Sequence, residues 1–420
     1  MRSSFLPFSP PSIGAEEIDE VIDTLRSGWL TTGPKAKRFE EEFCSFVGAD
    51  SALALNSCTA AVHVALATLG IGPGDAVITS PMGFCSSVHA IEHVGARPIF
   101  VDVEPNTLNL DPTKLRETIR QVEETNGALK VKALLPVHLY GHPCEMDSLL
   151  EIAREFELAV VDDAAHALPA KYRGRYIGSF QHSKDVPVLT CFSFYATKNL
   201  TTGEGGMLTG PRELIDEARV WSLHGMTKDA WRRDESENDG DRSWYYDVVS
   251  AGFKYNLSDI QAAIGLQQLR RLPKFYSRRA SIAHRYSEAF CEFDELKIPT
   301  SRAYVDHAWH LYVLQLNTVL LSMSRDQFVR ELKNRRIGAS VHFTPVHLQS
   351  FYRDKYGYAA DQFPIALEKY QTIVSLPMYP AMSDEDVEDV IAAVSEIVQE
   401  SRSKRYSTIK RLAVKANANS

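Results

Sequence analysis

Residues 192–206 read FSFYATKNLTTGEGG, and no other stretch of the chain is as informative. An apolar, β-rich segment leads into a lysine, Lys198, and a glycine-rich loop follows it. A buried ammonium group is costly, so a lysine at such a position is unusual unless its amine takes part in chemistry. A neutral lysine amine can form a Schiff base with an aldehyde. Many lysines that follow strands are solvated surface groups, so the rest of the chain must decide between these two interpretations.

The composition is that of an ordinary soluble globular protein, with 44% hydrophobic and 24% charged residues among 420. This length suggests two or three domains. The formal net charge of −8 argues against nucleic acid as the main partner. The amino terminus lacks the apolar core of a secretory signal, and no apolar run approaches the length of a membrane span. We therefore expect a cytoplasmic protein with no membrane span.

The cysteines are scattered along the chain, with no CxxC pair and no zinc-binding spacing. They are Cys44, Cys58, Cys85, Cys144, Cys191 and Cys291. This pattern predicts reduced thiols or small core residues, and no metal site is expected.

Short β-rich runs alternate with helical patterns between residues 50 and 210. The predicted strands are Ala52–Leu55, Ala76–Ser80, Pro98–Val103, Lys132–Val137, Leu158–Asp162, Val188–Phe194 and Gly206–Thr209. The predicted helices between them are Ala60–Leu69, Ser86–His93, Pro112–Val122 and Asp147–Phe156. Several strands are apolar without alternation, as in parallel sheets covered on both faces. The pattern predicts a doubly wound α/β domain whose ligands bind at the carboxyl ends of the strands.

The second half of the chain differs in pattern. A charged segment at 229–241 predicts an exposed loop, and a long helix is predicted from Ser258 to Phe290 with a break or kink at Pro273. A smaller α+β unit is predicted to follow, with strand Leu311–Leu316, helix Arg325–Arg335, strand Gly338–Phe343 and helix Asp384–Gln399. The expected division is an amino-terminal segment and large domain (1–255), a helical connection (256–295), a small domain (296–400) and a mobile, basic tail (401–420).

Segments that follow strands supply complementary parts of one ligand site. Residues 56–61 (NSCTAA) place small and hydroxyl residues at a helix start, where backbone N–H groups can bind a phosphate, although a simple helix cap is the alternative. Residues 160–166 (VVDDAAH) place two acids after an apolar strand. One of these carboxylates could pair with a protonated ring nitrogen or could be a structural aspartate.

Two more segments complete the set. Residues 81–87 (PMGFCSS) offer Phe84, which could stack on a flat ring or belong to the core. Ser193, on the strand before Lys198, could donate to a phosphate. A lysine for an aldehyde, an acid for a ring nitrogen, a phosphate site and a stacking face are the needs of pyridoxal phosphate. Together they are far more specific than any one segment.

The same residues carry a resemblance to a known family. The chain resembles the DegT/DnrJ/EryC1 family of pyridoxal-phosphate-dependent nucleotide-sugar aminotransferases, from residues 27–34 (SGWLTTGP) to 376–380 (LPMYP). Its specific motifs are residues 136–141 (PVHLYG), 163–167 (DAAHA), 192–206 and 258–263 (SDIQAA). Residues 6–9 (LPFS), 252–257 (GFKYNL) and 307–311 (HAWHL) look most like UDP-4-amino-4-deoxy-L-arabinose–oxoglutarate aminotransferases. The resemblance implies PLP fold type I, with a large domain built on a mainly parallel seven-stranded sheet and a smaller α+β domain.

The resemblance also implies roles for individual residues. Lys198 would carry the cofactor and move protons, Asp163 would pair with the ring nitrogen, and His166, where many members have Gln, would lie near the phenolic oxygen. Phe84 would stack on the ring. The phosphate would be held by Cys58 (in place of a common glycine), Thr59, Ala60, Ser193 and, from the partner subunit, either Asn256 or Lys254. Substrate contacts would come from Thr32, Ser87, His342 and His347, with surface histidines the alternative for the last two.

The implied activity is the transfer of an amino group from glutamate to a keto group of a nucleotide-linked sugar, with C4 as the favoured position. Glutamate would leave as 2-oxoglutarate. The implied assembly is a homodimer with shared active sites. A sugar dehydratase of the same fold is a rival, but those relatives have histidine where Lys198 stands. A non-catalytic cofactor- or sugar-binding regulator is a second rival. A nicotinamide-dependent dehydrogenase lacks support, because no GxGxxG follows the early strands.

Overall fold

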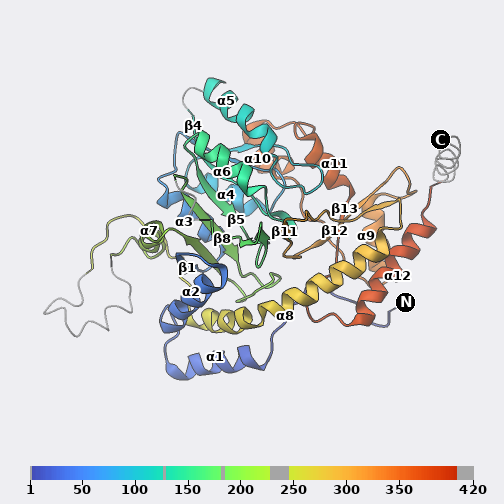
Figure 1. Ribbon diagram of the computed structural model, residues 1–420, viewed down its shortest axis with the longest axis horizontal. Coiled ribbons are helices and arrows are strands. Elements are labelled where there is room, and N and C mark those ends of the chain that lie inside the picture. Colours follow the sequence, from blue (N-terminus) through green and yellow to red (C-terminus); the bar gives the residue numbers. More distant parts are fainter. Residues whose placement is uncertain (1, 126–128, 181–184, 228–245, 404–420) are drawn as a thin grey trace.

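The computed structural model describes residues 2–125, 129–180, 185–227 and 246–403 (Figure 1). Its centre is a seven-stranded sheet in the order β1-β9-β8-β5-β4-β2-β3. The strands are β1 (Ser51–Leu55), β2 (Asp75–Thr79), β3 (Arg97–Phe100), β4 (Lys130–Leu135), β5 (Ala159–Asp163), β8 (Val188–Ser193) and β9 (Gly206–Gly210). Only the two pairings made by β9 are antiparallel. The predicted α/β fold with a mainly parallel sheet is confirmed.

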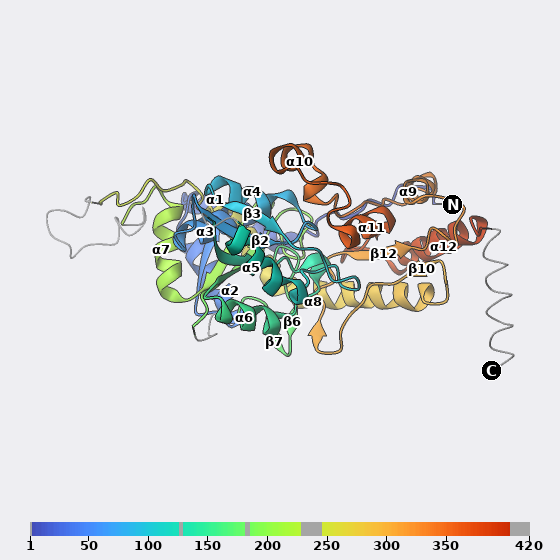
Figure 2. The same ribbon diagram turned by 90° about the horizontal axis from the view of Figure 1, so that it is seen from above.

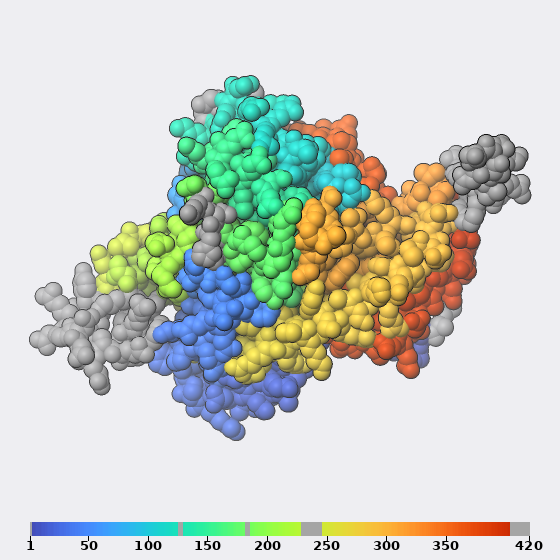
Figure 3. All heavy atoms as spheres, viewed as in Figure 1, coloured from blue at the N-terminus to red at the C-terminus, as the bar shows by residue number. Residues whose placement is uncertain are grey.

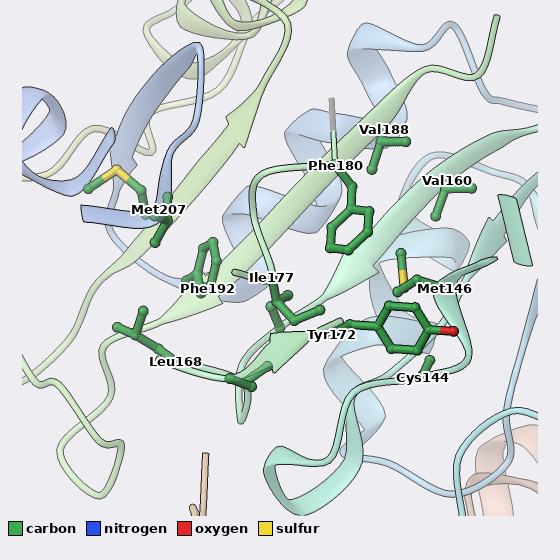
Figure 4. Packing of buried hydrophobic residues seen from close by; sticks show 14 of the residues in the cluster. Cys144, Met146, Val160, Leu168, Tyr172, Ile177, Phe180, Val188, Phe192 and Met207 are labelled. Carbon is green, nitrogen blue, oxygen red and sulfur yellow. The ribbon is translucent and has the colours of Figure 1, made fainter. Parts of the chain in front are cut away.

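Helices cover both faces of this sheet, which explains why several of its strands are apolar without alternation. One face packs against α2 (Pro34–Val47), α5 (Leu115–Thr125), α6 (Met146–Glu155) and the first half of α8 (Asp259–Phe290). The other face packs against α3 (Cys58–Thr68), α4 (Cys85–His93) and α7 (Arg212–Ser222). Figure 4 shows part of the first core, with Phe192, Met207 and Val160 of the sheet, Met146 of α6 and the preceding Cys144 among its members.

A third hydrophobic core lies in the carboxyl-terminal part, around the sheet β10-β12-β13. Its elements are β10 (Leu296–Lys297), β12 (Tyr312–Leu316), β13 (Ile373–Leu376), α9 (Arg325–Asn334) and α12 (Asp384–Glu400), packed on the second half of α8. The amino-terminal Leu6 joins this core through a bridge to Ile337. The remaining elements are α1 (Ala15–Ser27), β6 (Lys171–Tyr172), β7 (Arg175–Tyr176), β11 (Val305–Asp306), α10 (Ser350–Tyr356) and α11 (Pro364–Thr372).

Helix α8 connects the two parts of the molecule. It lies along the long axis of the molecule and extends into the carboxyl-terminal part in the view from above (Figure 2), and it crosses the face shown in Figure 3, in yellow. Ser258 caps it as predicted, accepting from the N–H of Gln261 while the Gln261 side chain accepts from the N–H of Ser258. The division of the chain into domains remains a proposal.

Two predicted features differ from the structure. A break or kink in the long helix was expected at Pro273. Helix α8 continues through this proline as one helix of 32 residues, so the prediction of a break was wrong. The predicted strand Gly338–Phe343 is not a strand: Ser340 makes a single bridge to Ser375, and β13 occupies that edge. The segment then turns so that His342 and Phe343 line a cavity instead of continuing a ladder. The predicted loop 229–241 and all but three residues of the tail 401–420 lie outside the described residues.

Within the described ranges, no helix has the length and apolarity that crossing a membrane requires. The same ranges hold no group of three or more His, Cys, Asp or Glu side chains arranged to bind a metal ion.

Candidate active site

A cavity of about 540 Å³ opens at the carboxyl ends of β5 and β8, as predicted for a doubly wound sheet. It is within the size range of small-molecule sites. Lys198, Asp163, His166, Ser193 and Phe84 line it together. Residues far apart in the sequence therefore meet around one space.

Lys198 lies on a tight turn after β8. Its backbone N–H donates to the carbonyl of Tyr195 (2.9 Å), and the chain returns at Thr202, whose N–H donates to the carbonyl of Phe194 (2.9 Å). The turn directs the lysine into the cavity rather than along the strand. Burial lowers the pKa of the Lys198 ammonium from 10.5 to about 8, although the Asp163 carboxylate and the Cys58 thiol act in the opposite direction. A useful fraction of this amine is therefore neutral near physiological pH.

The lowered pKa of Lys198 predicts the pH dependence of cofactor capture. Only the neutral amine attacks an aldehyde, so its reactive fraction rises about tenfold per pH unit below a pKa of about 8 and levels off above it. We expect the rate of pyridoxal phosphate uptake by the apoprotein, measured by stopped-flow absorbance, to follow this curve. A rate that keeps rising to about pH 10 would show an ordinary solvated lysine.

Asp163 ends β5 with its carboxylate held by donors. Oδ1 accepts from the Ala165 N–H (3.0 Å) and from the Cys58 thiol (3.9 Å), and Oδ2 accepts from the Ser87 hydroxyl. Asp162 points to the opposite face, where it accepts from Thr190 and where burial raises its pKa to about 7. Of the two adjacent acids, only Asp163 lines the cavity.

The amino terminus of α3 provides a candidate phosphate site. The Ser57 hydroxyl accepts from the Ala60 N–H (3.1 Å), so this donor is already used. The N–H groups of Cys58 and Thr59 belong to the first turn of α3 and have no hydrogen-bond partner within the helix. Both residues line the cavity. Anions bind favourably at such helix ends. Gly206 makes the site possible by close approach, because a Cβ there would lie 2.5 Å from the Ser57 carbonyl carbon and 2.6 Å from the Cys58 nitrogen.

Substitution Gly206→Ala therefore tests the phosphate site. The added methyl must displace the first turn of α3, and we expect affinity for pyridoxal phosphate to fall at least about tenfold, or about 1.4 kcal/mol. Fluorescence titration of the apoprotein measures this. The matched control is Gly72→Ala, where the nearest atom to a new Cβ is 3.6 Å away. Equal affinities of the two variants would contradict the assignment.

The other predicted residues are placed as follows. The Phe84 side chain is 59% exposed and borders the cavity, with its ring centroid 5.9 Å from that of Phe343. His166 accepts from the Tyr140 N–H at Nδ1 (3.2 Å), and burial together with Lys198 lowers its pKa well below the usual value. The same two causes lower the pKa of His342, another cavity residue, to about 4. Both histidines therefore stay neutral at physiological pH.

Several predicted residues do not line this cavity. Ser87 is buried behind Asp163, and His347 is buried, with Nε2 donating to the carbonyl of Ala360 (3.2 Å). The Thr32 hydroxyl donates to the carbonyl of Leu257 (2.5 Å) and accepts from the Asn256 amide (2.6 Å). Lys254 donates to Asn256. Asn256 and Lys254 thus lie away from the cavity of their own chain.

Sequence reasoning did not identify some of the lining residues. These are Phe8, Ser9, Tyr195, Glu204, His310 and Phe343. Long-range contacts bring four of them to the cavity, because Phe8 and Ser9 come from the amino terminus and His310 and Phe343 from the carboxyl-terminal part.

The donor set fits pyridoxal phosphate. Lys198 is available for an aldehyde, Asp163 for a ring nitrogen, and the first turn of α3 with Ser193 for a phosphate, all on one cavity. Gly206 has no side chain, so its backbone can lie against Ser57 without displacing the start of α3.

Comparison with known proteins agrees with this fit. Residues 11–395 match the model of the DegT/DnrJ/EryC1/StrS aminotransferase family. The chain is 50% identical over 400 residues to the spore coat polysaccharide biosynthesis protein SpsC of Bacillus subtilis, covering 95% of this chain and 98% of that protein. It is similar to the PLP form of the putative sugar aminotransferase Spr1654 of Streptococcus pneumoniae (33% identity, TM-score 0.83, 94% and 99% covered). It is also similar to S. venezuelae DesV (30% identity, TM-score 0.82, 94% and 99% covered).

Proposed function

The chain belongs to the DegT/DnrJ/EryC1/StrS aminotransferase family, whose sugar aminotransferases use pyridoxal phosphate, and on this premise we propose a specific reaction. The protein transfers an amino group from glutamate to the C4 keto group of a nucleotide-linked sugar. The observation that carries the proposal is the shared cavity of Lys198 and Asp163, two groups with opposite tasks in this chemistry.

Bound pyridoxal phosphate supplies an aldehyde that carries the amino group and a ring that delocalises the electrons left on the substrate carbon. The chain supplies the proton transfers. The Lys198 amine, with its pKa near 8, both accepts and donates a proton near neutral pH, as a general base and acid must. Asp163, held by hydrogen bonds from Ala165 and Ser87, would pair its carboxylate with the ring nitrogen and keep that nitrogen protonated. Phe84, on the cavity wall, would cover one face of the bound ring.

The sugar substrate is supported by the names of relatives. SpsC is named for polysaccharide biosynthesis and Spr1654 as a putative sugar aminotransferase. The nucleotide and the C4 position rest on the motif resemblance alone. The finer likeness to UDP-4-amino-4-deoxy-L-arabinose enzymes, on residues 6–9, 252–257 and 307–311, does not appear among the names of these relatives, and we do not extend the proposal to that sugar.

We propose a homodimer with shared sites. Asn256 and Lys254 lie away from the cavity of their own chain, so a phosphate contact from either requires the partner subunit's cavity. Thr32, which accepts a hydrogen bond from Asn256, would lie at the same place between the two subunits. His342 would contact the substrate from within its own chain. A cytoplasmic location stays a prediction.

Two experiments in sequence test the function. Glutamate added to the holoenzyme should convert the absorbance of lysine-bound cofactor to that of pyridoxamine phosphate, and the absence of conversion would favour a binding protein. Nucleotide-linked 4-keto and 3-keto sugars are then added to the pyridoxamine form. Return of the original absorbance with 4-keto sugars supports the proposal, whereas return with 3-keto sugars alone would refute the C4 assignment. Loss of a sugar hydroxyl without glutamate consumption would indicate the dehydratase.

A further inference from the structure

Asn199, the residue after Lys198, determines which nitrogen of His310 carries the proton. Its Nδ2 donates to the carbonyl oxygens of Leu168 (2.9 Å) and Ala308 (2.8 Å). Both partners can only accept, so the amide nitrogen faces them and the amide oxygen faces His310. Nδ1 of His310 lies 3.3 Å from that oxygen. Because the oxygen can only accept, Nδ1 is the protonated nitrogen of His310.

The other edge of the His310 imidazole faces the cavity. The side chain is 5% exposed and lines the cavity, while Nδ1 is turned toward the buried Asn199. The edge opposite Nδ1 carries Nε2, and no described residue hydrogen-bonds to it. The backbone is fixed on both sides, by N–H donation to the Tyr140 carbonyl (3.1 Å) and by donation from Arg279 to the His310 carbonyl (3.1 Å). Burial, with His166 and Lys198, lowers the pKa of His310 well below the usual value. Its Nε2 lone pair is therefore free at neutral pH.

His166, beside it, has the opposite tautomer. Its Nδ1 accepts from the Tyr140 N–H, so Nε2 carries the proton. The two ring centroids are 4.4 Å apart. One wall of the cavity thus presents a fixed donor and a fixed acceptor next to Lys198. The family resemblance implies the phenolic oxygen of the cofactor as the partner of the donor on His166, whereas it implies no partner for the acceptor on His310.

We propose that the Nε2 lone pair of His310, held in place by Asn199, accepts a hydrogen bond from the C3 hydroxyl of the keto sugar. This inference rests on the proposed function, because C3 is the hydroxyl-bearing neighbour of the aminated C4. A 3-deoxy substrate would leave the buried acceptor unpaired, which costs more than a missing contact. His310 is then a specificity-determining residue, and Asn199 is a positioning residue.

The first test measures the tautomer directly and needs no substrate. Two-bond ¹H–¹⁵N correlation spectra of the ¹⁵N-histidine-labelled holoenzyme should show His310 with protonated Nδ1 and unprotonated Nε2, assigned by its loss in His310→Gln. Asn199→Ala should shift this signal toward a mixture of tautomers. The matched control His307→Gln removes another buried histidine of the same segment, which contacts the Trp309 N–H and does not line the cavity. A protonated Nε2 in the wild type would overturn the inference.

The second test measures selectivity. The wild type should use a UDP-linked 4-keto sugar at least about tenfold better in kcat/KM than its 3-deoxy counterpart. His310→Phe keeps an aromatic ring without an acceptor and should abolish this preference, while His310→Gln should restore part of it. A wild type that turns over both sugars equally would overturn the inference alone. A wild type that turns over no keto sugar would overturn the proposed function and the inference with it.

Discussion

Replacement of Lys198 by alanine is expected to reduce turnover by at least about 10⁴-fold, the upper range for a lost acid–base group, and to remove the visible absorbance of lysine-bound cofactor. The reason is its position, since Lys198 is the one lysine that lines the cavity within the described part of the chain. Stopped-flow assays with glutamate measure the rate, and absorbance spectra of the purified variant measure the bound cofactor.

The controls separate chemistry from folding. The pKa of Lys198 is lowered by burial, so its ammonium is not stabilising, and the unfolding temperature of the K198A apoprotein should be no lower than that of the wild type. Lys198→Arg keeps a cation but cannot form a Schiff base, and it should be as inactive as K198A. Small primary amines added to K198A should restore part of the activity. A variant that transaminates at the wild-type rate would refute the role of Lys198.

Replacement of Asp163 by asparagine should lower the glutamate half-reaction by about 10²–10³-fold, the usual cost of removing one preorganised electrostatic group. The amide keeps the shape of the carboxylate: its oxygen can still accept from the Ala165 N–H, and its NH2 group can donate to the Ser87 hydroxyl. It carries no charge to keep a ring nitrogen protonated. Single-turnover kinetics with glutamate measure the effect, and the spectrum of the bound cofactor should change as well.

The neighbouring acid provides the matched control. Asp162 is buried on the opposite face of β5, and burial raises its pKa to about 7, so Asp162→Asn replaces a group that does not face the cavity and is only partly ionised at neutral pH. Its turnover should stay within about threefold of the wild type. If D162N is as slow as D163N, the loss reflects damage to β5 rather than the missing charge facing the cavity.

Much of the large domain was predictable because several of its strands are apolar runs between helical patterns. The predicted strand Leu158–Asp162, for instance, differs from β5 by one residue at each end. Helices α1 and α2 were not predicted. Their N-cap residues are glycines without a capping side chain, and the start of α2 is capped by the distant Asp259, which accepts from the Gly33 and Ala36 N–H groups. The available signals were Gly28 and Gly48 after the helix ends and Pro34 at the start of α2.

The strand predicted at Gly338–Phe343 failed because tertiary contacts outweigh β propensity there. The segment has strand-forming residues, but His342 and Phe343 point into the cavity instead of extending a sheet. The predicted His347 lies only five residues further on, yet the turn Val346–Leu348 buries it against Phe363. A sequence spacing alone cannot show which side of a turn faces the cavity.

The cavity residues that directly follow a strand were predictable from the sequence, whereas those placed by contacts with distant segments were not. Lys198, Asp163 and the start of α3 each follow a strand, and parallel strands end at one edge. The Ser87 contact with Asp163 joins two such segments through a buried hydrogen bond that no motif displays. His310 was missed because its exposed lone pair follows from the orientation of the Asn199 amide.

The most direct measurement reduces the holoenzyme with borohydride, digests it, and locates the phosphopyridoxyl mass by peptide sequencing. We predict a single modified lysine at position 198, the residue that the turn after β8 directs toward Asp163. A phosphopyridoxyl group on any other lysine, with position 198 unmodified, would contradict the account.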